Sequence, residues 1–441
     1  MTVNHIMQTL TNWQEVYSSF VPESLSDAVK CINEFIRICE GKRLVLWGAN
    51  MHGNTLHRLF SDIGLKVSAF LDRNHKEILT LNGIEVYPPQ WLSTLSGDDN
   101  IVLIASVNNK NFLSVKKNLE EIAPSLYLHN GYLLHYPLQS AACFLKVEKN
   151  KLEIQNCSSC TKSYHTCPIL RKYLIDNNTE CINKGGAGIT LISCILGTIC
   201  SLKCKHCAEH VPYIVEINKR FMPKNEIMHD IYTLARAGEF ITAVEFLGGE
   251  PFLHPELAEI IEETREIENI GIINVFTNGT IMPSKALLRQ LSKKNVIITF
   301  GNYTNNLSPK RQVRINETES VLMESGIKMF NIKNFTWFDT LSFERVEDNE
   351  TMLEERYRNC FFRDCYRLYD GKLFHCMHHY AGFVTNNLPI DDSVVHIHEQ
   401  PMGEVSLIDR LNRFTSLPYI EACRYCEMPY KSMTVSSGIQ L

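Results

Sequence analysis

Apolar runs alternate with amphipathic stretches between residues 189 and 345, and this alternation limits the fold more than any other feature of the 441-residue chain. The runs ITLISCIL, AVEFL, INVFT, VIITF and IKMFNI have the length of buried strands. The segments between them carry apolar residues at helical spacing, such as Ile227, Ile231 and Leu234. Strands that alternate with helices lie parallel and are covered by those helices, so the pattern predicts a parallel sheet, either open or closed into a barrel.

A second α/β pattern precedes it, in residues 1–138. After a helical lead-in, the chain reads as a strand, a glycine turn, a helix and a strand that ends at Asp72, which predicts a small open sheet of the Rossmann type. The turn from Gly48 to Gly53 lacks the central glycine of G-x-G-x-x-G, although Asp72 stands where an acid would bind ribose. Nucleotide binding therefore stays open, and a docking or substrate-presenting role is favoured.

The rest of the chain divides into a connector, residues 139–188, and a tail, residues 346–441. In the connector the pattern loosens, and Cys157, Cys160 and Cys167 form C-x2-C-x6-C. That spacing leaves a third metal site and structural thiols as equal alternatives. The tail is rich in Cys and His, which predicts a small α+β domain organised by metal.

The charge balance bears on partners and location. The chain carries 44 basic and 49 acidic residues, a formal net charge of −5, and so offers no basic field for nucleic acid. The N-terminus lacks a basic start followed by an apolar run, and no apolar run approaches the roughly 20 residues that span a bilayer. We therefore expect a cytoplasmic protein without membrane contact, in which the cysteines are metal ligands rather than disulfides.

Three cysteines follow the first strand of the alternating region. The stretch CSLKCKHC places Cys200, Cys204 and Cys207 at C-x3-C-x2-C. Thiolates select zinc, copper(I) or iron–sulfur clusters. A structural zinc site closes with four ligands, commonly as two separated pairs, whereas three thiolates on a four-iron cluster leave one iron open. The spacing favours such a cluster, with a zinc loop or buried thiols as the alternatives.

This loop resembles that of the radical SAM superfamily, in which C-x3-C-x2-C after the first barrel strand binds a [4Fe-4S] cluster. The resemblance implies a partial (β/α)6 barrel over residues 189–345. It also implies that S-adenosylmethionine binds the open iron through its amino and carboxylate groups.

Two further motifs, GGEP and TNGT, match the superfamily at the ends of the next two predicted strands. The first would orient the methionine amino group, because glycines expose backbone at close range and a carboxylate attracts ammonium. The second would contact the ribose and carboxylate. All three motifs lie at the carboxyl ends of strands, where barrel sites assemble. The implied cofactor-binding residues are Gly248, Gly249, Glu250, Pro251, Thr277 and Asn278.

The tail contains CFFRDCYRLYDGKLFHC and, later, CRYC, with the spacing C-x10-G-x4-C around Gly371. It resembles the twitch domain, the shortened form of the SPASM domain, and this implies an auxiliary [4Fe-4S] cluster saturated by four thiolates. Cys365 is an alternative to the first ligand, and structural zinc is an alternative to the cluster. The five histidines near these cysteines are expected to pack or to face water. The implied ligands are Cys360, Cys376, Cys423 and Cys426.

The resemblance implies one-electron chemistry, in which the reduced cluster cleaves S-adenosylmethionine to a 5′-deoxyadenosyl radical. The electron would come from a donor such as flavodoxin or ferredoxin. The tail is similar to that of an amino-cyclitol alcohol dehydrogenase, and the first domain, with GIEVYPP, to Rossmann-like domains that accompany sugar-modifying enzymes. We therefore expect a radical SAM oxidoreductase that oxidises a carbohydrate-like small molecule, a sugar or amino-cyclitol alcohol, with the auxiliary cluster as electron acceptor.

Two other functions stay as alternatives: a peptide- or protein-modifying maturase, and a non-catalytic iron–sulfur or zinc scaffold. A general base for the hydroxyl proton is not placed by the sequence. Lys310, Arg311 and Arg314 fit solvated surface charge equally well.

Overall fold

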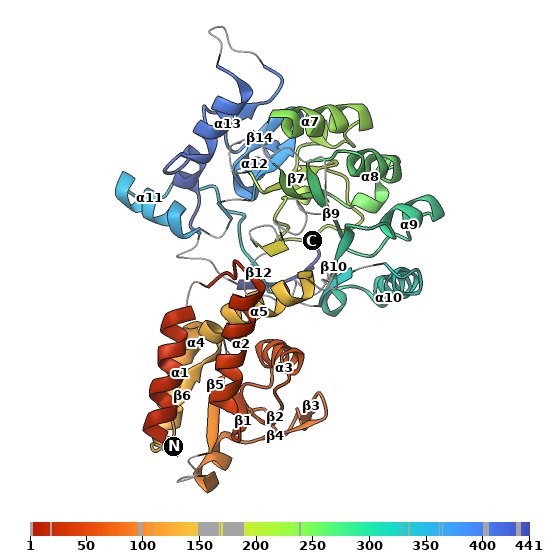
Figure 1. The fold of residues 1–441 in the computed structure, drawn as a ribbon. Coiled ribbons are helices and arrows are strands. Elements are labelled where there is room, and N and C mark those ends of the chain that lie inside the picture. The colour runs from red at the N-terminus through yellow and green to blue at the C-terminus, as the bar shows by residue number, and fades with distance from the viewer. Residues whose placement is uncertain are drawn as a thin grey trace. The chain divides into compact units, whose positions relative to one another are not determined.

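The structure is a computed structural model of the chain, and its two compact units, Met1–Tyr173 and Leu174–Leu441, are described separately (Figure 1). The connector cysteines Cys157 and Cys160 lie outside the described residues. The described residues are 3–17, 20–95, 100–107, 109–148, 167, 169–170, 189–237, 240–327, 329–333, 336–360, 362–363, 365–399, 405–428 and 434–441.

The first unit is an open sheet in the order β3-β4-β2-β1-β5-β6, parallel except for the pair β3 and β4. Alternate strand residues face opposite sides. Leu44 and Leu46 pack with α1, α2, α3 and α5, whereas Val45 and Leu103 pack with α4 and η1. The elements are α1 (Val3–Tyr17), α2 (Leu25–Cys39), β1 (Arg43–Trp47), α3 (Met51–Asp62), β2 (Val67–Leu71), β3 (Thr80–Leu81), β4 (Ile84–Tyr87), η1 (Pro89–Leu95), β5 (Ile101–Ala105), α4 (Asn109–Ile122), β6 (Leu128–Asn130) and α5 (Gly131–Glu148).

The second unit is built on an eight-stranded sheet in the order β11-β10-β9-β8-β7-β13-β14-β15. A separate two-stranded sheet joins β12 and β16. The strands are β7 (Leu191–Ile195), β8 (Ile241–Leu247), β9 (Ile270–Thr277), β10 (Val296–Asn302), β11 (Met329–Lys333), β12 (Thr336–Phe338), β13 (Arg367–Tyr369), β14 (Lys372–Phe374), β15 (Val395–His396) and β16 (Thr434–Ser436). The α-helices are α7 (Lys224–Ala237), α8 (Leu257–Arg265), α9 (Lys285–Leu291), α10 (Pro309–Glu324), α11 (Glu350–Asn359), α12 (Met377–Val384) and α13 (Leu407–Thr415). The 3-10 helices are η4 (Val211–Tyr213), η5 (Glu216–Asn218), η6 (Pro251–Leu253), η7 (Thr304–Asn306) and η8 (Glu421–Tyr425).

The sheet contains parallel neighbours as predicted, but its sixth parallel strand differs from a six-repeat barrel. Strands β7 to β11 follow one another, and β13 from the tail then pairs parallel to β7, at the far side from β11. The predicted sixth repeat is absent from the described residues because the run after β11 is short and pairs with β16 instead. The residues predicted as a separate tail domain thus extend the barrel sheet.

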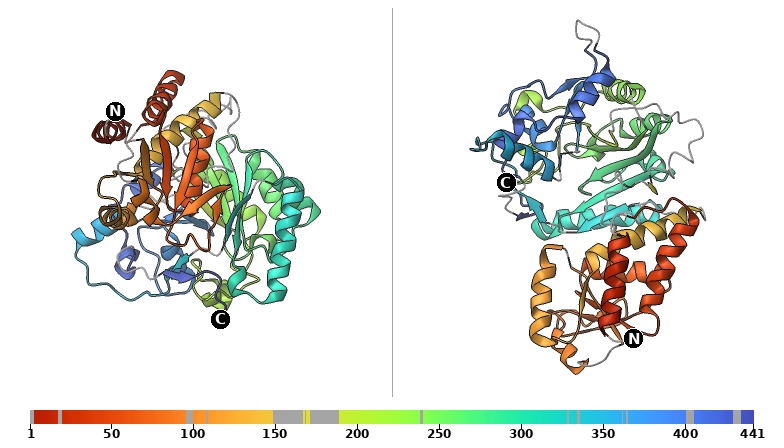
Figure 2. Two further views of the ribbon diagram at one scale, coloured as in Figure 1. Left: turned by 90° about the horizontal axis from the view of Figure 1, so that it is seen from below. Right: turned by 60° about the vertical axis from the view of Figure 1, so that its left-hand side comes forward.

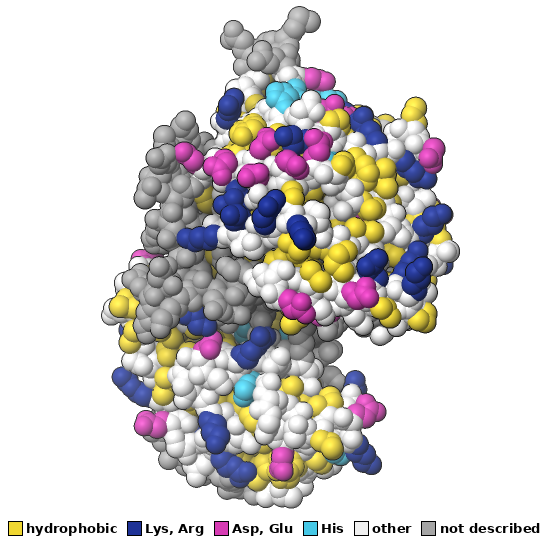
Figure 3. All heavy atoms as spheres, turned by 90° about the vertical axis from the view of Figure 1, so that its right-hand side faces the viewer, with side chains coloured by type: hydrophobic (Ala, Val, Ile, Leu, Met, Phe, Trp, Pro, Cys, Tyr) yellow, Lys and Arg dark blue, Asp and Glu magenta, His cyan; other side chains and the backbone are white. Residues whose placement is uncertain are grey.

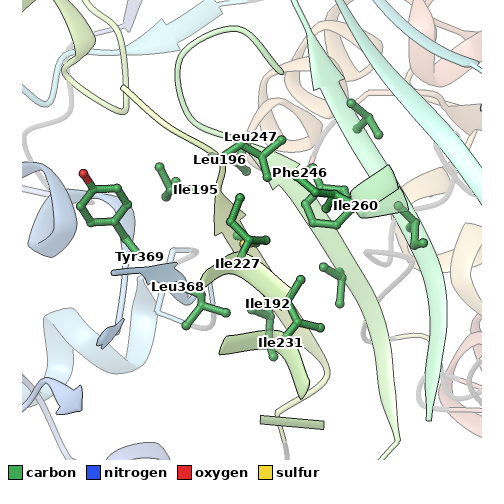
Figure 4. Packing of buried hydrophobic residues seen from close by; sticks show 14 of the residues in the cluster. Ile192, Ile195, Leu196, Ile227, Ile231, Phe246, Leu247, Ile260, Leu368 and Tyr369 are labelled. Atoms are coloured by element: carbon green, nitrogen blue, oxygen red, sulfur yellow. The ribbon is translucent and has the colours of Figure 1, made fainter. Parts of the chain in front are cut away.

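One face of this sheet is apolar and covered by helices, which lie outside the strands (Figure 2). Ile192 of β7, Ile227 and Ile231 of α7, Phe246 of β8 and Ile260 of α8 belong to one core cluster (Figure 4). Burying each such side chain contributes about 1.5–3 kcal/mol. The apolar positions alternate along each strand, so the intervening residues face the other side of the sheet.

Charged side chains of both signs are interspersed on the face seen in Figure 3, in keeping with the near balance of acidic and basic residues. Among the described residues no helix combines the length and the apolar character needed to cross a bilayer.

Candidate metal-cluster sites

The three-cysteine loop begins directly after β7, and its thiols lie close to one another. Burial, with a smaller effect of a neighbouring thiol in each case, raises the pKa of Cys200 and Cys207 to about 12 and that of Cys204 to about 11. Without metal these thiols are therefore neutral at pH 7, and a bound metal must displace their protons. None of the three is in a disulfide.

The glycines of GGEP let this strand end pack against the cysteine loop. Gly249 N donates to Gly197 O at 2.9 Å, and Glu250 N donates to Ile199 O at 2.9 Å. A Cβ on Gly249 would lie 1.9 Å from Ile199 O, and one on Gly248, at φ +130°, would lie 2.4 Å from Gly197 O. Both positions require glycine, because any side chain would push the loop away.

We expect Gly249→Ala to displace the cysteine loop and to lower iron binding by about four atoms per chain, counted after anaerobic reconstitution. Overpacking of this kind also costs about 1–3 kcal/mol of unfolding free energy. Gly326→Ala is the control, because Gly326 has φ +67° but open space around it, so only backbone strain is added. Equal iron content in the two variants would contradict the packing role of Gly249.

Glu250 joins the GGEP and TNGT strand ends. Its buried carboxylate accepts hydrogen bonds from Phe252 N at 3.0 Å, Thr277 Oγ1 at 2.7 Å and Asn278 N at 2.9 Å. Pro251 begins η6 directly after it. The prediction that this carboxylate attracts an ammonium group stays a prediction, and in the structure the carboxylate is held by three protein donors. Its geometry is that of a positioning residue.

The contribution of Glu250 to the free energy of unfolding depends on pH, because its pKa is shifted. Burial raises this pKa to about 7 from the ordinary 4.5, against the opposing effect of its hydrogen bonds. A raised carboxyl pKa means that the folded state prefers the proton, so this contribution to stability is full below about pH 4.5 and is lost as pH rises through 7. We expect the unfolding free energy of the metal-free protein to fall by about 3 kcal/mol over this range relative to Glu250→Gln, in urea titrations at pH 4.5 and 8. Parallel pH profiles of the two proteins would contradict it.

TNGT reaches the cysteine loop through Asn278. Its Nδ2 donates to Cys200 Sγ at 3.6 Å and to Ser201 Oγ at 3.2 Å, while its Oδ1 accepts from Thr280 N at 2.9 Å. Thr277 is tied to Glu250. The structure thus brings all three predicted motifs together at the carboxyl ends of β7, β8 and β9.

A row of buried polar side chains crosses the sheet on the face away from the helices, and sequence reasoning missed it. Ser193 Oγ donates to Glu245 Oε2 at 3.0 Å, and Asn274 Nδ2 donates to Glu245 Oε1 at 3.1 Å. Thr299 Oγ1 then donates to Asn274 Oδ1 at 3.1 Å. The signal was present, because a polar residue interrupts each of the four apolar runs: Ser193, Glu245 and Asn274 are register partners, and Thr299 lies two residues beyond the register partner of Asn274.

Arg367 of β13 extends this row, since it pairs in register with Ser193. Its Nη2 and Nε lie 2.8 and 3.1 Å from Glu209 Oε1, and both residues are buried. Burial lowers the pKa of Arg367, but the carboxylates of Glu209 and Glu245 more than offset this and raise it. The other oxygen, Glu209 Oε2, is buried with no hydrogen-bond partner in the described structure.

Four tail cysteines line one pocket, with about 390 Å³ of empty space when its open mouth is included. Cys360 ends α11, Cys376 precedes α12, and Cys423 and Cys426 lie in and after η8. Cys365 is not among the lining residues. The sequence left Cys360 and Cys365 open as alternative first ligands. In the structure Cys360, and not Cys365, lines the pocket together with Cys376, Cys423 and Cys426.

Arg356 holds the last two of these cysteines in place. Its Nη1 donates to Cys423 O at 3.1 Å and also to Cys426 O, and its Nη2 pairs with Asp348. The side chain is buried and lines the pocket. Sequence spacing gave no signal for this contact.

The spacing of the cysteines bears on whether each site would hold a single metal ion or a cluster. In the part of the chain that the structure describes, no three His, Cys, Asp or Glu side chains are placed to hold one ion together. The thiolates of a cluster bind different irons and stand farther apart than thiolates about 2.3 Å from one zinc ion. The four-thiol pocket fits such a group.

Three of the tail histidines, His375, His378 and His379, are buried, and the other two pair with carboxylates. Burial lowers the pKa of His375 to about 3 and of His378 and His379 to about 4, as expected for packed, neutral rings. His378 also lines the four-thiol pocket, and its Nε2 lies 2.9 Å from Tyr425 O. His396 pairs with the exposed Glu399, and His398 pairs with the buried Asp230.

Asp72 of the first unit is hydrogen-bonded to backbone N–H groups of the neighbouring loops. Its Oδ2 accepts from Ala49 N and its Oδ1 accepts from Asn74 N, each at 2.9 Å. Asn50 caps α3 through bonds from His52 N and Gly53 N. The carboxylate and the helix start are thus engaged by the loop itself.

Part of the chain is similar in sequence to known proteins. Residues 194–314 match the family model described as the Radical SAM superfamily. A GTP 3',8-cyclase of Clostridium acetobutylicum is 31% identical over 122 residues, 27% of this chain and 37% of that protein. Molybdenum cofactor biosynthesis protein 1 of Dictyostelium discoideum is 25% identical over 187 residues, 42% of this chain and 26% of that protein. The chain thus spans well under half the length of these relatives.

The likeness to solved structures is weak. One is described as native anSMEcpe with bound AdoMet and Cp18Cys peptide, at 14% identity and a TM-score of 0.29 over 38% of this chain and 56% of that one. Another is BtrN in complex with AdoMet and 2-DOIA, at 13% identity and a TM-score of 0.31 over 46% and 77%. The family match covers the cysteine loop and both strand-end motifs, so residues 194–314 form a radical SAM superfamily domain.

Proposed function

We propose that this protein is a radical SAM oxidoreductase that converts an alcohol carbon of a small, hydroxyl-rich substrate into a carbonyl. The observation that carries the proposal is the joining of the three motifs: Asn278 contacts Cys200, and Glu250 ties Asn278 to the strand end that packs on the loop. Cys200, Cys204 and Cys207 would hold a [4Fe-4S] cluster with S-adenosylmethionine, and the four tail cysteines would hold an auxiliary one.

When bound, these groups would supply a carbon radical that removes a hydrogen atom from the substrate and an acceptor for the second electron. The electron that starts each turnover would come from a flavodoxin or ferredoxin. The chain's own residues have to bind the substrate, orient it and take its hydroxyl proton.

The polar row supports a substrate with several hydroxyl groups. Ser193, Glu245, Asn274 and Thr299 present hydroxyl, carboxylate and amide groups on the sheet face that no helix of the repeats covers. Such groups supply both donors and acceptors, as recognition of a polyol requires.

Glu209 is the proposed general base. The Arg367 guanidinium holds its Oε1, and Oε2 is a buried acceptor that lacks a donor within the described structure. A substrate hydroxyl would supply that donor. After loss of the carbon-bound hydrogen atom, transfer of the hydroxyl proton to Oε2 and of one electron to the acceptor leaves a C=O bond, so the substrate loses two hydrogens in all.

The first experiment is anaerobic reconstitution of the whole chain followed by reduction with S-adenosylmethionine present. We expect about eight irons per chain and formation of 5′-deoxyadenosine. Protein that binds zinc and no iron, or that releases no 5′-deoxyadenosine, would refute the enzyme function. Sugars and amino-cyclitols are then screened by mass spectrometry for a two-dalton loss.

GTP is a second candidate substrate, because the relatives named above include a GTP 3',8-cyclase. The same assay distinguishes the two. Consumption of GTP without loss of mass from any alcohol would favour cyclisation over oxidation.

A further inference from the structure

A segment far along the chain, residues 434–441, lies against the three-cysteine loop. Lys205 N donates to Ile439 O at 2.7 Å, and Leu441 N donates to Lys203 O at 2.9 Å. Cys204 and Gln440 are antiparallel bridge partners. We call residues 434–441 the strap.

The strap is fixed to the barrel on its other side. Its first residues form β16, which pairs with β12, and Asn306 Nδ2 donates to Ser437 O at 2.7 Å. Gly438, at φ +73°, packs on Tyr303. A Cβ added to Gly438 would lie 2.4 Å from Tyr303 Cβ. These contacts hold the strap in register with the loop.

The side chain of Gln440 is oriented by two groups that can only donate. Its Oε1 accepts from Lys203 N at 3.0 Å and from Arg311 Nη1 at 3.4 Å. The amide therefore cannot be flipped without losing both bonds. Its Nε2 consequently points at Cys204 Sγ, 3.3 Å away, and also donates to Gly438 O at 2.7 Å.

An N–H aimed at a cluster thiolate has a defined electrostatic effect. Hydrogen bonds to the sulfurs are among the factors that set the reduction potential of an iron–sulfur cluster. Reduction adds negative charge to the cluster, so a donor favours the reduced form. Arg311, which contacts Gln440, carries a positive charge that acts in the same direction.

We propose that the strap is part of the first cluster site and that Gln440 is a positioning residue, which orients Cys204 and raises the reduction potential of the cluster that Cys204 holds. This inference rests on the proposed function, because it concerns the same cluster. It assigns a role to a residue 236 positions away from the cysteine that it contacts.

The test compares Gln440→Glu and Gln440→Leu with the wild type, each loaded with iron in the whole chain. Glu keeps the acceptor for Lys203 N and Arg311 but replaces the donor, whereas Leu loses both. The midpoint potential of the three-cysteine cluster is measured by EPR during a redox titration. We expect both variants to keep their iron and to show about a tenfold lower ratio of reduced to oxidised cluster at a fixed potential, which is 59 mV for one electron.

Gln139→Leu is the matched control, since Gln139 Nε2 donates to Cys143 Sγ at 3.1 Å in the first unit, and neither residue belongs to the three-cysteine loop or to the strap. Its potential should equal that of the wild type. If the iron-loaded variants of Gln440 keep the wild-type midpoint potential, or if the control shifts with them, the inference is overturned while the proposed function stands. If Gln440→Leu loses the cluster, the midpoint potential of Gln440→Glu, which keeps the acceptor for Lys203 N and Arg311, tests the inference instead. A wild-type protein without iron would overturn the proposed function and the inference together.

Discussion

Replacing Cys360 with alanine is expected to remove about four irons per chain and to abolish oxidation of the substrate, while 5′-deoxyadenosine is still formed. Cys360 lines the four-thiol pocket, so its loss leaves the auxiliary cluster one thiolate short. The three-cysteine loop does not contain it and should keep its own four irons. Anaerobic iron and sulfide counting, together with product analysis, measures both effects.

Cys365→Ala is the matched control for this prediction. Cys365 lies five residues further along the chain and is not among the lining residues of the pocket. We expect its iron content and its product yield to match the wild type. The opposite pattern, with iron lost from Cys365→Ala and retained by Cys360→Ala, would show that the ligand assignment is wrong.

Glu209→Gln is expected to lower the rate of substrate oxidation by about 10²–10⁴-fold, the usual contribution of a general base. The amide keeps the volume of the side chain and a carbonyl acceptor for Arg367, but it cannot take the hydroxyl proton. Because Glu209 is not one of the cysteines proposed to bind a cluster, 5′-deoxyadenosine should still form. Oxidised substrate should not form in equal amount. The ratio of 5′-deoxyadenosine to oxidised product therefore rises.

Two measurements separate this role from a structural one. The iron content of Glu209→Gln and its rate of 5′-deoxyadenosine formation should equal those of the wild type, while its yield of oxidised product falls. Glu216→Gln, at an exposed site in η5, should leave the iron content and the yield of oxidised product unchanged. Oxidation by Glu209→Gln at the wild-type rate would eliminate Glu209 as the base.

The parallel sheet and the meeting of the three motifs were predictable, because both follow from local patterns. Alternation of strands and helices dictates parallel neighbours, and parallel strands bring their carboxyl ends to one edge. Cys200, Glu250 and Asn278 each follow such a strand. Their mutual contacts then follow from topology.

The contacts that sequence reasoning missed are long-range. Gln440 meets Cys204, Arg367 meets Glu209, and β13 joins β7, with separations far beyond any local pattern. No periodicity encodes which distant strand fills a sheet edge. The same holds for Glu250, whose residue type was informative but whose three donors become visible only when the strands are assembled.

The place of β13 beside β7 has a consequence for how this protein can be divided. A fragment that stops before residue 367 would leave the N–H and C=O groups along one side of β7 unpaired. Exposed apolar edges of that kind recruit other chains, so such a fragment is prone to aggregate rather than to stay monomeric. The barrel and its tail are therefore one folding unit. Fragments that separate β7 from β13 are expected to aggregate when they are expressed or recombined.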